Sequence, residues 1–227
     1  MTSLVPRPDL VCLSHLRWGC ADQRPQQLMT RFGRRGRVFF CEEPLLGESA
    51  NPRLEMKAAS DGVFVVQPML PAGLEPEALD IVQGILLNAM LHEMDVRSYV
   101  LWFYNPLAVR FTQYFNPAAV VYDCMDELAG FADVSAEWLS RERELLARSD
   151  LVFTGGQSSH QARRWPHARV HEFPNGGDAD ARARGTSWDE TCEAMDALLD
   201  QVLTDKAALR PRPRRRTRQL AAARELH

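Results

Sequence analysis

Residues 9–44 read DLVCLSHLRWGCADQRPQQLMTRFGRRGRVFFCEEP. Two short apolar runs, DLVCLSH (9–15) and RVFFCEEP (37–44), flank a segment that has the spacing of a helix. Pro25 stands where the first turn of a helix accepts a proline, and Gly33 stands where such a helix ends. Strand, helix and strand within about 35 residues is the length of a βαβ unit. This stretch therefore predicts two parallel strands joined by a crossover helix.

The same alternation continues along the chain. Further runs that read as strands are LEMKAAS (54–60), GVFVVQPML (62–70), SYVLWFY (98–104), AAVVYDCMDE (118–127), LVFTGG (151–156) and RVHEFPNGGD (169–178). Stretches that read as helices are 75–94, a short one in 105–115, 135–150 with Ser135 as N-cap, and a short one in 157–166. Asp61-Gly62 between the first two of these strands is a strong hairpin signal. The order predicts an α/β fold with a doubly wound, Rossmann-like parallel sheet that helices cover on both faces.

The chain divides into four parts by composition. These are a Rossmann-like domain (1–178), a low-complexity linker (179–186), one amphipathic helix (187–205) and a basic, disordered tail (206–227). Ser187 and Glu190 match the S-x-x-E capping box at the start of that helix. A lone helix of this length is marginal in water, so we expect it to pack back on the domain.

Composition bounds the class of protein. The 227 residues are 45% hydrophobic and 25% charged, with a net charge of -3, which gives no general reason to expect nucleic acid as a partner. The basic run at 210–218 reads as a solvated tail, with a nucleic-acid or phospholipid contact as the alternative. No run of about 18 apolar residues is present, and MTSLVPRPD has no signal-peptide core. We expect a cytoplasmic protein with at most peripheral membrane contact.

The cysteines indicate neither disulfides nor zinc. They are odd in number, widely spaced and never in a C-x-x-C arrangement: Cys12, Cys20, Cys41, Cys124 and Cys192. Three of them lie inside strand-like runs, where a free cysteine behaves as a small hydrophobe. A reducing compartment fits this pattern.

Polar residues at the carboxyl ends of the strands are the first candidates for a site, because open α/β sheets bind ligands there. After the first strand come His15, Trp18, Gln23 and Arg24. An aromatic ring among hydrogen-bonding groups is a common way to hold a sugar. Alternatively, Trp18 covers the sheet edge and Arg24 pairs with a helix acid. His15 is the best-placed histidine for a base, with a structural role as the alternative.

Carboxylates follow two later strands. Glu42 and Glu43 end the second run, and Asp123, Asp126 and Glu127 end the 118–127 run. Such acids bind sugar hydroxyls, act as a base or hold a metal. None recurs at a calcium-loop spacing, so we expect no metal. The last two acids could equally stabilise the N-terminus of the following helix through its dipole.

Gly155 and Gly156 let the backbone approach a ligand or turn tightly into a helix. The sequence has no G-x-G-x-x-G and no Walker loop, so it supports neither a dinucleotide site nor an NTPase. A G-x-S-x-G elbow is also absent, which argues against an α/β-hydrolase. A small flavodoxin-like or phosphate-binding enzyme is disfavoured for the same lack of a phosphate loop.

Several segments together resemble the N-terminal half of bacterial GT-B glycosyltransferases of the glycosyl transferase family 1/4 group. They are SHLRWGCADQRPQQLMTRF, VFFCEEP, VVYDCMDELAGF, RERELLARSDLVFTGG and FPNGGD, which fall within about residues 9–178. The family's W-x-x-x-x-Q-R-P segment is Trp18 to Pro25 here. The resemblance implies two facing doubly wound domains and transfer of a glycosyl group from a nucleotide-sugar to an acceptor, without a fixed metal.

The resemblance also implies site residues. Trp18, Gln23 and Arg24 would line the acceptor side of the cleft, with Asp123 and Asp126 near it. We add Glu43, Gly155 and Gly156 as acceptor-binding candidates, and His15, Asp123 and Asp126 as catalytic candidates. No cofactor is expected beyond the nucleotide-sugar co-substrate of the full-length family.

The chain departs from the family after Pro174-Asn175-Gly176-Gly177-Asp178. In the family this hinge leads into a second domain that carries the donor site, whereas here a short linker leads to the 187–205 helix. That helix resembles the family's closing helix. We therefore expect a member without its donor domain, inactive alone, whose partners are a small-molecule or a glycan- or lipid-linked acceptor and a separate donor-domain chain. The alternative is a non-catalytic α/β binding module, or a degenerate fragment, that docks a partner protein.

Overall fold

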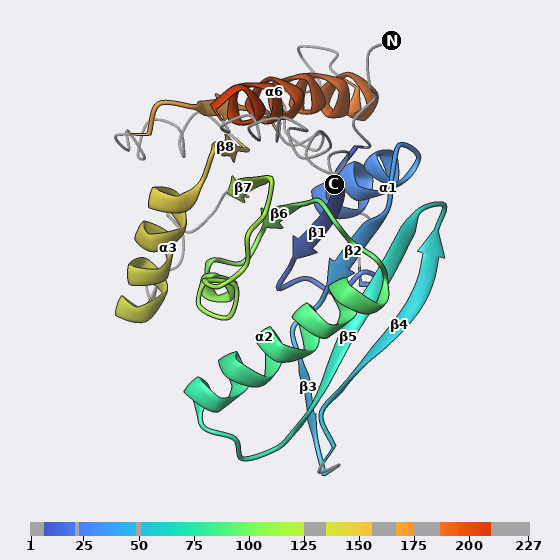
Figure 1. Ribbon diagram of the computed structural model, residues 1–227, viewed down its shortest axis with the longest axis vertical. Helices are drawn as coiled ribbons and strands as arrows, with labels where there is room; N and C mark the ends of the chain where they lie inside the picture. Colours follow the sequence, from blue (N-terminus) through green and yellow to red (C-terminus); the bar gives the residue numbers. More distant parts are fainter. Residues whose placement is uncertain are drawn as a thin grey trace, which may run out of the picture.

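The computed structural model describes residues 7–20, 23–48, 51–124, 135–155, 167–174 and 187–209, and one nine-stranded sheet runs through them (Figure 1). The strands are β1 (Asp9–Leu13), β2 (Val38–Cys41), β3 (Leu45–Gly47), β4 (Arg53–Ser60), β5 (Val63–Pro71), β6 (Tyr99–Phe103), β7 (Ala119–Cys124), β8 (Leu151–Thr154) and β9 (Val170–Glu172). The helices are α1 (Arg24–Gly33), α2 (Pro76–Glu93), the 3-10 helix η1 (Pro106–Val109), α3 (Ala136–Arg148) and α6 (Trp188–Leu209).

The sheet is doubly wound, as the sequence predicts. Its order is β3-β5-β2-β1-β6-β7-β8-β9, and every neighbouring pair on this path is parallel. From β1 the chain first adds strands on one side, beginning with β2, and later adds strands on the other side, beginning with β6. The point at which the strand order reverses therefore lies beside β1. The predicted βαβ unit is β1, α1 and β2, in which Leu10 aligns with Val38. The carboxyl ends of β1, β2, β6, β7 and β8 therefore meet at one edge.

A hairpin adds the one antiparallel strand among the described residues. β4 pairs with β5 across the predicted Asp61-Gly62 turn. Gly62 adopts a φ of 71°, and a Cβ at this position would stand 2.0 Å from the carbonyl oxygen of Gly33. A side chain here would be strained and would collide with the end of α1, so the turn requires glycine. The three-residue strand β3 beside β5 was not predicted.

One face of the sheet is covered by α1 and α6, which lie side by side (Figure 1). Leu28 and Met29 of α1 and Met195 and Leu199 of α6 are buried in the core between these helices and the sheet. At the start of α6, Ser187 Oγ accepts from the amide of Glu190, and a Glu190 carboxylate oxygen accepts from the amide of Ser187. The capping box and the docking of this helix are confirmed, and the helix runs four residues past its predicted end, to Leu209.

The opposite face is covered by α2, η1 and α3. Ser135 caps α3 as predicted, its Oγ accepting from the amide of Trp138 at 3.1 Å. Of the stretch 105–115, which was predicted to contain a short helix, four residues form the 3-10 helix η1. The long helix predicted at 75–94 is α2, which buries only three of its 18 residues.

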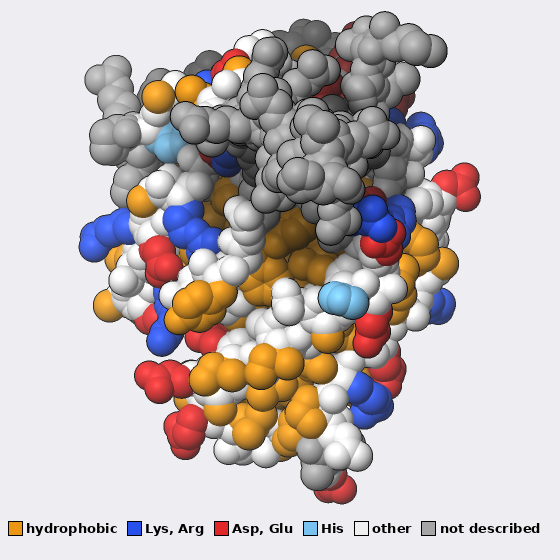
Figure 2. Space-filling model, viewed as in Figure 1, with side chains coloured by type: hydrophobic (Ala, Val, Ile, Leu, Met, Phe, Trp, Pro, Cys, Tyr) orange, Lys and Arg blue, Asp and Glu red, His pale blue; other side chains and the backbone are white. Residues whose placement is uncertain are grey.

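α2 leaves apolar side chains in solvent. Ile81 and Ile85, one turn apart on its outer side, are each 63% exposed. Figure 2 shows apolar side chains gathered over α2 and the neighbouring end of the sheet.

Among the described residues, no helix is both long enough and apolar enough to cross a membrane. The predicted helix at 157–166 lies outside the described residues, as do Asp126, Glu127 and Gly156.

Candidate functional site

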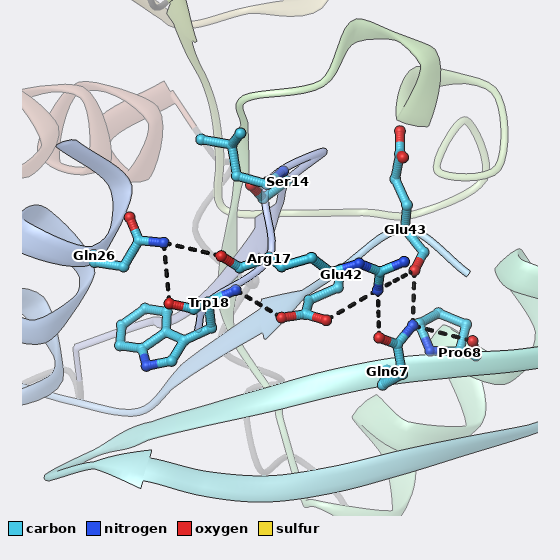
Figure 3. A network of polar contacts seen from close by, with 9 residues as sticks. Ser14, Arg17, Trp18, Gln26, Glu42, Glu43, Gln67 and Pro68 are labelled. Atoms are coloured by element: carbon cyan, nitrogen blue, oxygen red, sulfur yellow. Dashed lines mark hydrogen bonds and ion pairs between the residues drawn. The ribbon is translucent and has the colours of Figure 1, made fainter. Parts of the chain in front are cut away.

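The loop that follows β1 is tied to the loop that follows β2 by a polar network (Figure 3). The Trp18 amide donates to Glu42 Oε1 at 2.7 Å, and Arg17 Nη1 donates to Glu42 Oε2 at 3.0 Å. Arg17 also donates to the side-chain oxygen of Gln67 on β5 and, at 2.8 Å, to the carbonyl oxygen of Glu43. The charge of Glu42 is therefore neutralised within the network, which fixes both loops at the carboxyl edge of the sheet.

The start of α1 holds the same loop from its other side. Gln26 Nε2 donates to the carbonyl oxygens of Arg17 and Trp18, at 3.2 and 3.3 Å. The half-buried Trp18 ring packs edge-on against Phe40, with 5.0 Å between ring centroids and 70° between planes. This packing fits the interpretation in which Trp18 covers the sheet edge. Gln23 is exposed just before α1, and its backbone N–H donates to Gln26 Oε1 at 3.2 Å.

Arg24 and Asp123, two of the predicted site residues, form a buried ion pair. Arg24 is 4% exposed and Asp123 is 0% exposed. Arg24 Nη2 and Nε donate to Asp123 Oδ1 at 2.9 and 3.1 Å, and Arg24 Nη1 donates to the carbonyl oxygen of Phe173. The partner of Arg24 is thus an acid at the end of a strand, not on a helix. Two buried charges that neutralise each other across α1 and β7 act first as a structural tie.

His15 stands at the carboxyl end of β1 and reaches solvent. Partial desolvation lowers the pKa of His15, while the negative charge of Glu43 and a backbone hydrogen bond at Tyr104 act in the opposite direction. A lowered pKa favours the neutral imidazole, which is the form that accepts a proton. Gly155 follows β8 at the same edge, three strands along the sheet from β1.

A pocket of about 280 Å³ opens on the α2 face at this edge. It lies between α2, η1 and the ends of β1 and β2, with β5 behind it. Twelve of its 18 lining residues are apolar. The six polar ones are Ser14, Glu42, Glu43, Asp80, Gln83 and Asn105. Of these, Glu43 was predicted as a site residue and Glu42 was noted as a possible ligand-binding acid.

Asp80, Gln83 and Asn105 were missed. Asn105 follows β6 at the carboxyl edge, so the rule that selected Glu43 could have found it. Its Nδ2 donates to Glu43 Oε1 at 3.0 Å, and its Oδ1 accepts from the amide of Leu107 at 3.0 Å. Asp80 and Gln83, three residues apart, are two of several polar positions on a largely apolar helix, which is a weaker signal in the sequence.

Asp80 is the least exposed of the three acids on α2, and it lines the pocket. Two guanidinium nitrogens face it, Arg110 Nε at 3.6 Å and Arg141 Nη2 at 4.0 Å from Oδ2. Burial nevertheless raises the pKa of Asp80 above the usual aspartate value, and the two arginines only partly offset this. Across the described parts of the chain, no three His, Cys, Asp or Glu side chains are grouped so that they could hold a metal ion.

Comparison with known proteins finds the fold and no family. No family model matches the sequence, and no curated protein matches it significantly. A solved sucrose-phosphate synthase from Thermosynechococcus elongatus matches with a TM-score of 0.54 at 15% identity, over 78% of this chain and 52% of that one. A second structure of that synthase, designated 27_220_406_426, matches with a TM-score of 0.56 at 12% identity, over 86% of this chain and 98% of that one.

An E. coli structure described as trehalose-6-phosphate bound with UDP-2-fluoro glucose matches with a TM-score of 0.51 at 10% identity. The alignment covers 78% of this chain and 50% of that one. The chain thus spans about half the length of two of these solved structures. Its fold is like that of GT-B glycosyltransferases.

Proposed function

We propose that this chain is the acceptor-side half of a glycosyltransferase that uses a nucleotide-sugar, with the donor half supplied by another chain. The observation that carries the proposal is the docking of α6 on α1 after a connection of only 15 residues from the end of β9. This chain covers 98% of the synthase structure designated 27_220_406_426 and 52% of the other synthase structure.

The chemistry assigned to this half is acceptor binding and proton removal. In glycosyl transfer, the acceptor oxygen bonds to the anomeric carbon while the bond from that carbon to the diphosphate oxygen breaks, and the hydroxyl loses its proton. His15 is the candidate base. It stands at the carboxyl edge of the sheet, where the negative charge of Glu43 favours the protonated imidazole that forms when His15 takes the proton. Glu43 lines the pocket in which we place the acceptor. Stabilising the departing diphosphate is the task of the donor half.

Calorimetry and a transfer assay test this proposal. The chain alone is titrated with UDP-glucose and GDP-mannose, and we expect no tight binding of either. Transfer of labelled sugar is then measured for the chain, for a separately produced GT-B donor domain and for their mixture, and we expect product only from the mixture. His15→Gln should reduce that product, and His92→Gln, on an exposed turn of α2, is the matched control.

Two outcomes contradict the proposal in different ways. Tight nucleotide-sugar binding by the chain alone would show that the donor site lies on this chain and not on a separate one. Absence of transfer in every mixture would remove the enzymatic assignment.

A non-catalytic binding module is the second candidate. The Arg24–Asp123 pair favours it, because two of the predicted site residues bind each other in the core. In that case the pocket binds a ligand, and no glycosyl group is transferred to that ligand.

A further inference from the structure

We infer that the α2-face pocket takes an uncharged or cationic amphiphile as its ligand: an apolar body that carries hydroxyl or ammonium groups, and no phosphate or carboxylate. If the chain has the function proposed above, this ligand is the acceptor; that identification rests on the proposed function. The pocket's charge, its unused hydrogen-bonding groups and its walls each support it.

The charge of the lining has one sign. None of the 18 lining residues is lysine, arginine or histidine, and three are carboxylates: Glu42, Glu43 and Asp80. The nearby cations do not line the pocket and already face its acids. Arg17 pairs with Glu42, and Arg110 and Arg141 lie 3.6 and 4.0 Å from Asp80. An anionic ligand would therefore enter next to acids without a cation of its own, which is costly in a partly desolvated site.

The strongest unused hydrogen-bonding groups of the lining are charged acceptors. Asn105 donates one N–H to Glu43 and accepts from the amide of Leu107, which leaves its second N–H. Gln83 Nε2 donates one N–H to the carbonyl oxygen of Leu79 at 3.3 Å, which leaves its second N–H and its Oε1. Glu43 Oε2 and both oxygens of Asp80 accept no hydrogen bond from any residue that the structure describes. A ligand that donates hydrogen bonds satisfies these oxygens, and one that only accepts does not.

Ser14 adds a hydroxyl proton to the spare N–H groups of Asn105 and Gln83. It is 2% exposed, and its Oγ accepts from the amide of Leu16 at 3.0 Å. Its own O–H has no acceptor among the described residues, so it can donate once to a ligand hydroxyl. These donors are neutral, whereas the unused oxygens of Glu43 and Asp80 belong to carboxylates, which make the stronger hydrogen bonds. The preference for a donating ligand therefore remains.

The walls require an apolar body. Leucines from five elements, among them Leu13, Leu54 and Leu87, surround the space together with Phe111. A volume of about 280 Å³ is near the small end of ligand pockets, which begin at roughly 300 Å³. The pocket therefore holds one apolar segment and the polar groups next to it, not an extended sugar chain.

The test compares three probes that share an octyl chain and differ in the head group. Octyl glucoside, octylammonium and octyl phosphate are titrated into the full chain, each below its critical micelle concentration, and binding is followed by calorimetry. We expect octyl glucoside and octylammonium to bind at least about 10-fold more tightly than octyl phosphate, which corresponds to about 1.4 kcal/mol. Equal affinities for the three, binding of none, or a preference for the phosphate would overturn the inference.

Two substitutions locate the effect. Asp80→Asn removes a charge in the pocket without changing its size, and we expect it to weaken octylammonium by about 10-fold while changing octyl glucoside little. Asp200→Asn makes the same change at an exposed position of α6 and should change neither. If both variants weaken octylammonium equally, the preference is a property of the net charge and the inference is wrong.

The outcome is separable from that of the proposed function. Discrimination among the probes without transfer in any mixture contradicts the glycosyltransferase proposal and leaves the ligand class standing. Transfer to a phosphorylated acceptor in preference to octyl glucoside contradicts the ligand class and leaves the glycosyltransferase proposal standing.

Discussion

The two faces of the sheet are covered in different ways. On the α1/α6 face, α6 buries Cys192, Met195 and Leu199 to 1% exposure or less, and ion pairs hold it at both ends. These pairs are Arg31–Asp189 and Arg35–Asp196 near its start, and Arg169–Asp205 and Lys206–Asp150 near its end. On the α2 face, α2 buries three residues, leaves Ile81 and Ile85 in solvent and forms a wall of the pocket.

The difference separates structural polar groups from available ones. On the α1/α6 face, the buried charges Arg24 and Asp123 are paired at hydrogen-bonding distance. On the α2 face, Asp80 keeps 3.6 Å or more from its arginines and has oxygens to spare. An acid whose charge is paired at hydrogen-bonding distance contributes to the structure, and an acid with unused oxygens beside a pocket is one that a ligand can engage. The predictions below test this contrast.

The largest effect is expected from Asp123→Ala on the α1/α6 face. The substitution leaves the Arg24 guanidinium buried without its carboxylate, and breaking such a pair costs about 3–5 kcal/mol. The free energy of unfolding is measured by urea denaturation. The double variant Arg24→Met/Asp123→Leu, which removes both charges, should recover most of the loss. A loss below about 1 kcal/mol in the single variant would show that the pair does not hold this face together.

A matched truncation compares the two helices directly. Leu199 on α6 is 1% exposed and Ile85 on α2 is 63% exposed. Leu199→Ala should lower the free energy of unfolding by about 2–5 kcal/mol, because it leaves a cavity in the core. Ile85→Ala should change it by no more than about 0.5 kcal/mol, as is usual for surface positions. Similar losses for the two would mean that α2 is as closely packed as α6.

Thermal unfolding of these two variants supplies the control. If Leu199→Ala only released α6, the remaining domain would keep its own transition, and two transitions would appear. A single transition at lower temperature shows that α6 and the sheet unfold together. The second result is expected, since α6 shares one core with α1 and the sheet.

The α1/α6 face was more predictable from the sequence than the α2 face. Its signals are local: Pro25 at the start of α1, the turn at Gly62, and the capping box of Ser187 and Glu190 are each readable within a few residues. The docking of α6 followed from the instability of a lone helix. On the other face, Ser135 as the cap of α3 was equally local and was equally predictable.

The pairings that create the site were not predictable in this way. Arg24 and Asp123 are 99 residues apart, and each alone had the character of a ligand-binding residue. Asp80 belongs to a helix with apolar residues on all sides, so periodicity did not say which side would line a pocket. Asn105 touches Glu43 because β6 and β2 flank β1, an order that the sequence does not state. Long-range register decides these contacts, and local patterns do not contain it.

Gly84→Ala tests the packing of α2 against the segment after η1. A Cβ at this position would lie 2.8 Å from the carbonyl oxygen of Phe111. Helix propensity favours alanine by about 1 kcal/mol, and overpacking against backbone costs about 1–3 kcal/mol. We expect a net loss of about 1 kcal/mol in urea denaturation and weaker octyl glucoside binding, because residues of α2 and Phe111 both line the pocket.

The control for this prediction is Asn88→Ala, at an exposed position of the same helix. It changes propensity without a contact and should gain up to about 0.7 kcal/mol with unchanged octyl glucoside binding. A gain in both variants would show that α2 is free to move away from Phe111.

The smallest effect concerns Asp80 and depends on pH. Because burial raises the pKa of Asp80 in the folded protein, the folded state binds this proton more tightly than the unfolded state. Stability from this group therefore falls as pH rises from the unfolded pKa to the raised folded pKa, and stays lower above it. Asp80→Asn should be slightly more stable than the parent at about pH 7, and this advantage should disappear below about pH 4. Urea midpoints at the two pH values measure it.

A lower stability of Asp80→Asn at neutral pH would show that Arg110 and Arg141 outweigh desolvation, and that this acid is structural like Asp123. The expected result has the opposite meaning. An acid that is destabilised by burial while it lines a pocket is a candidate for ligand binding, since perturbed acids in clefts cluster at functional sites. The same substitution should then improve the fold and weaken octylammonium binding, whereas Asp123→Ala should only damage the fold.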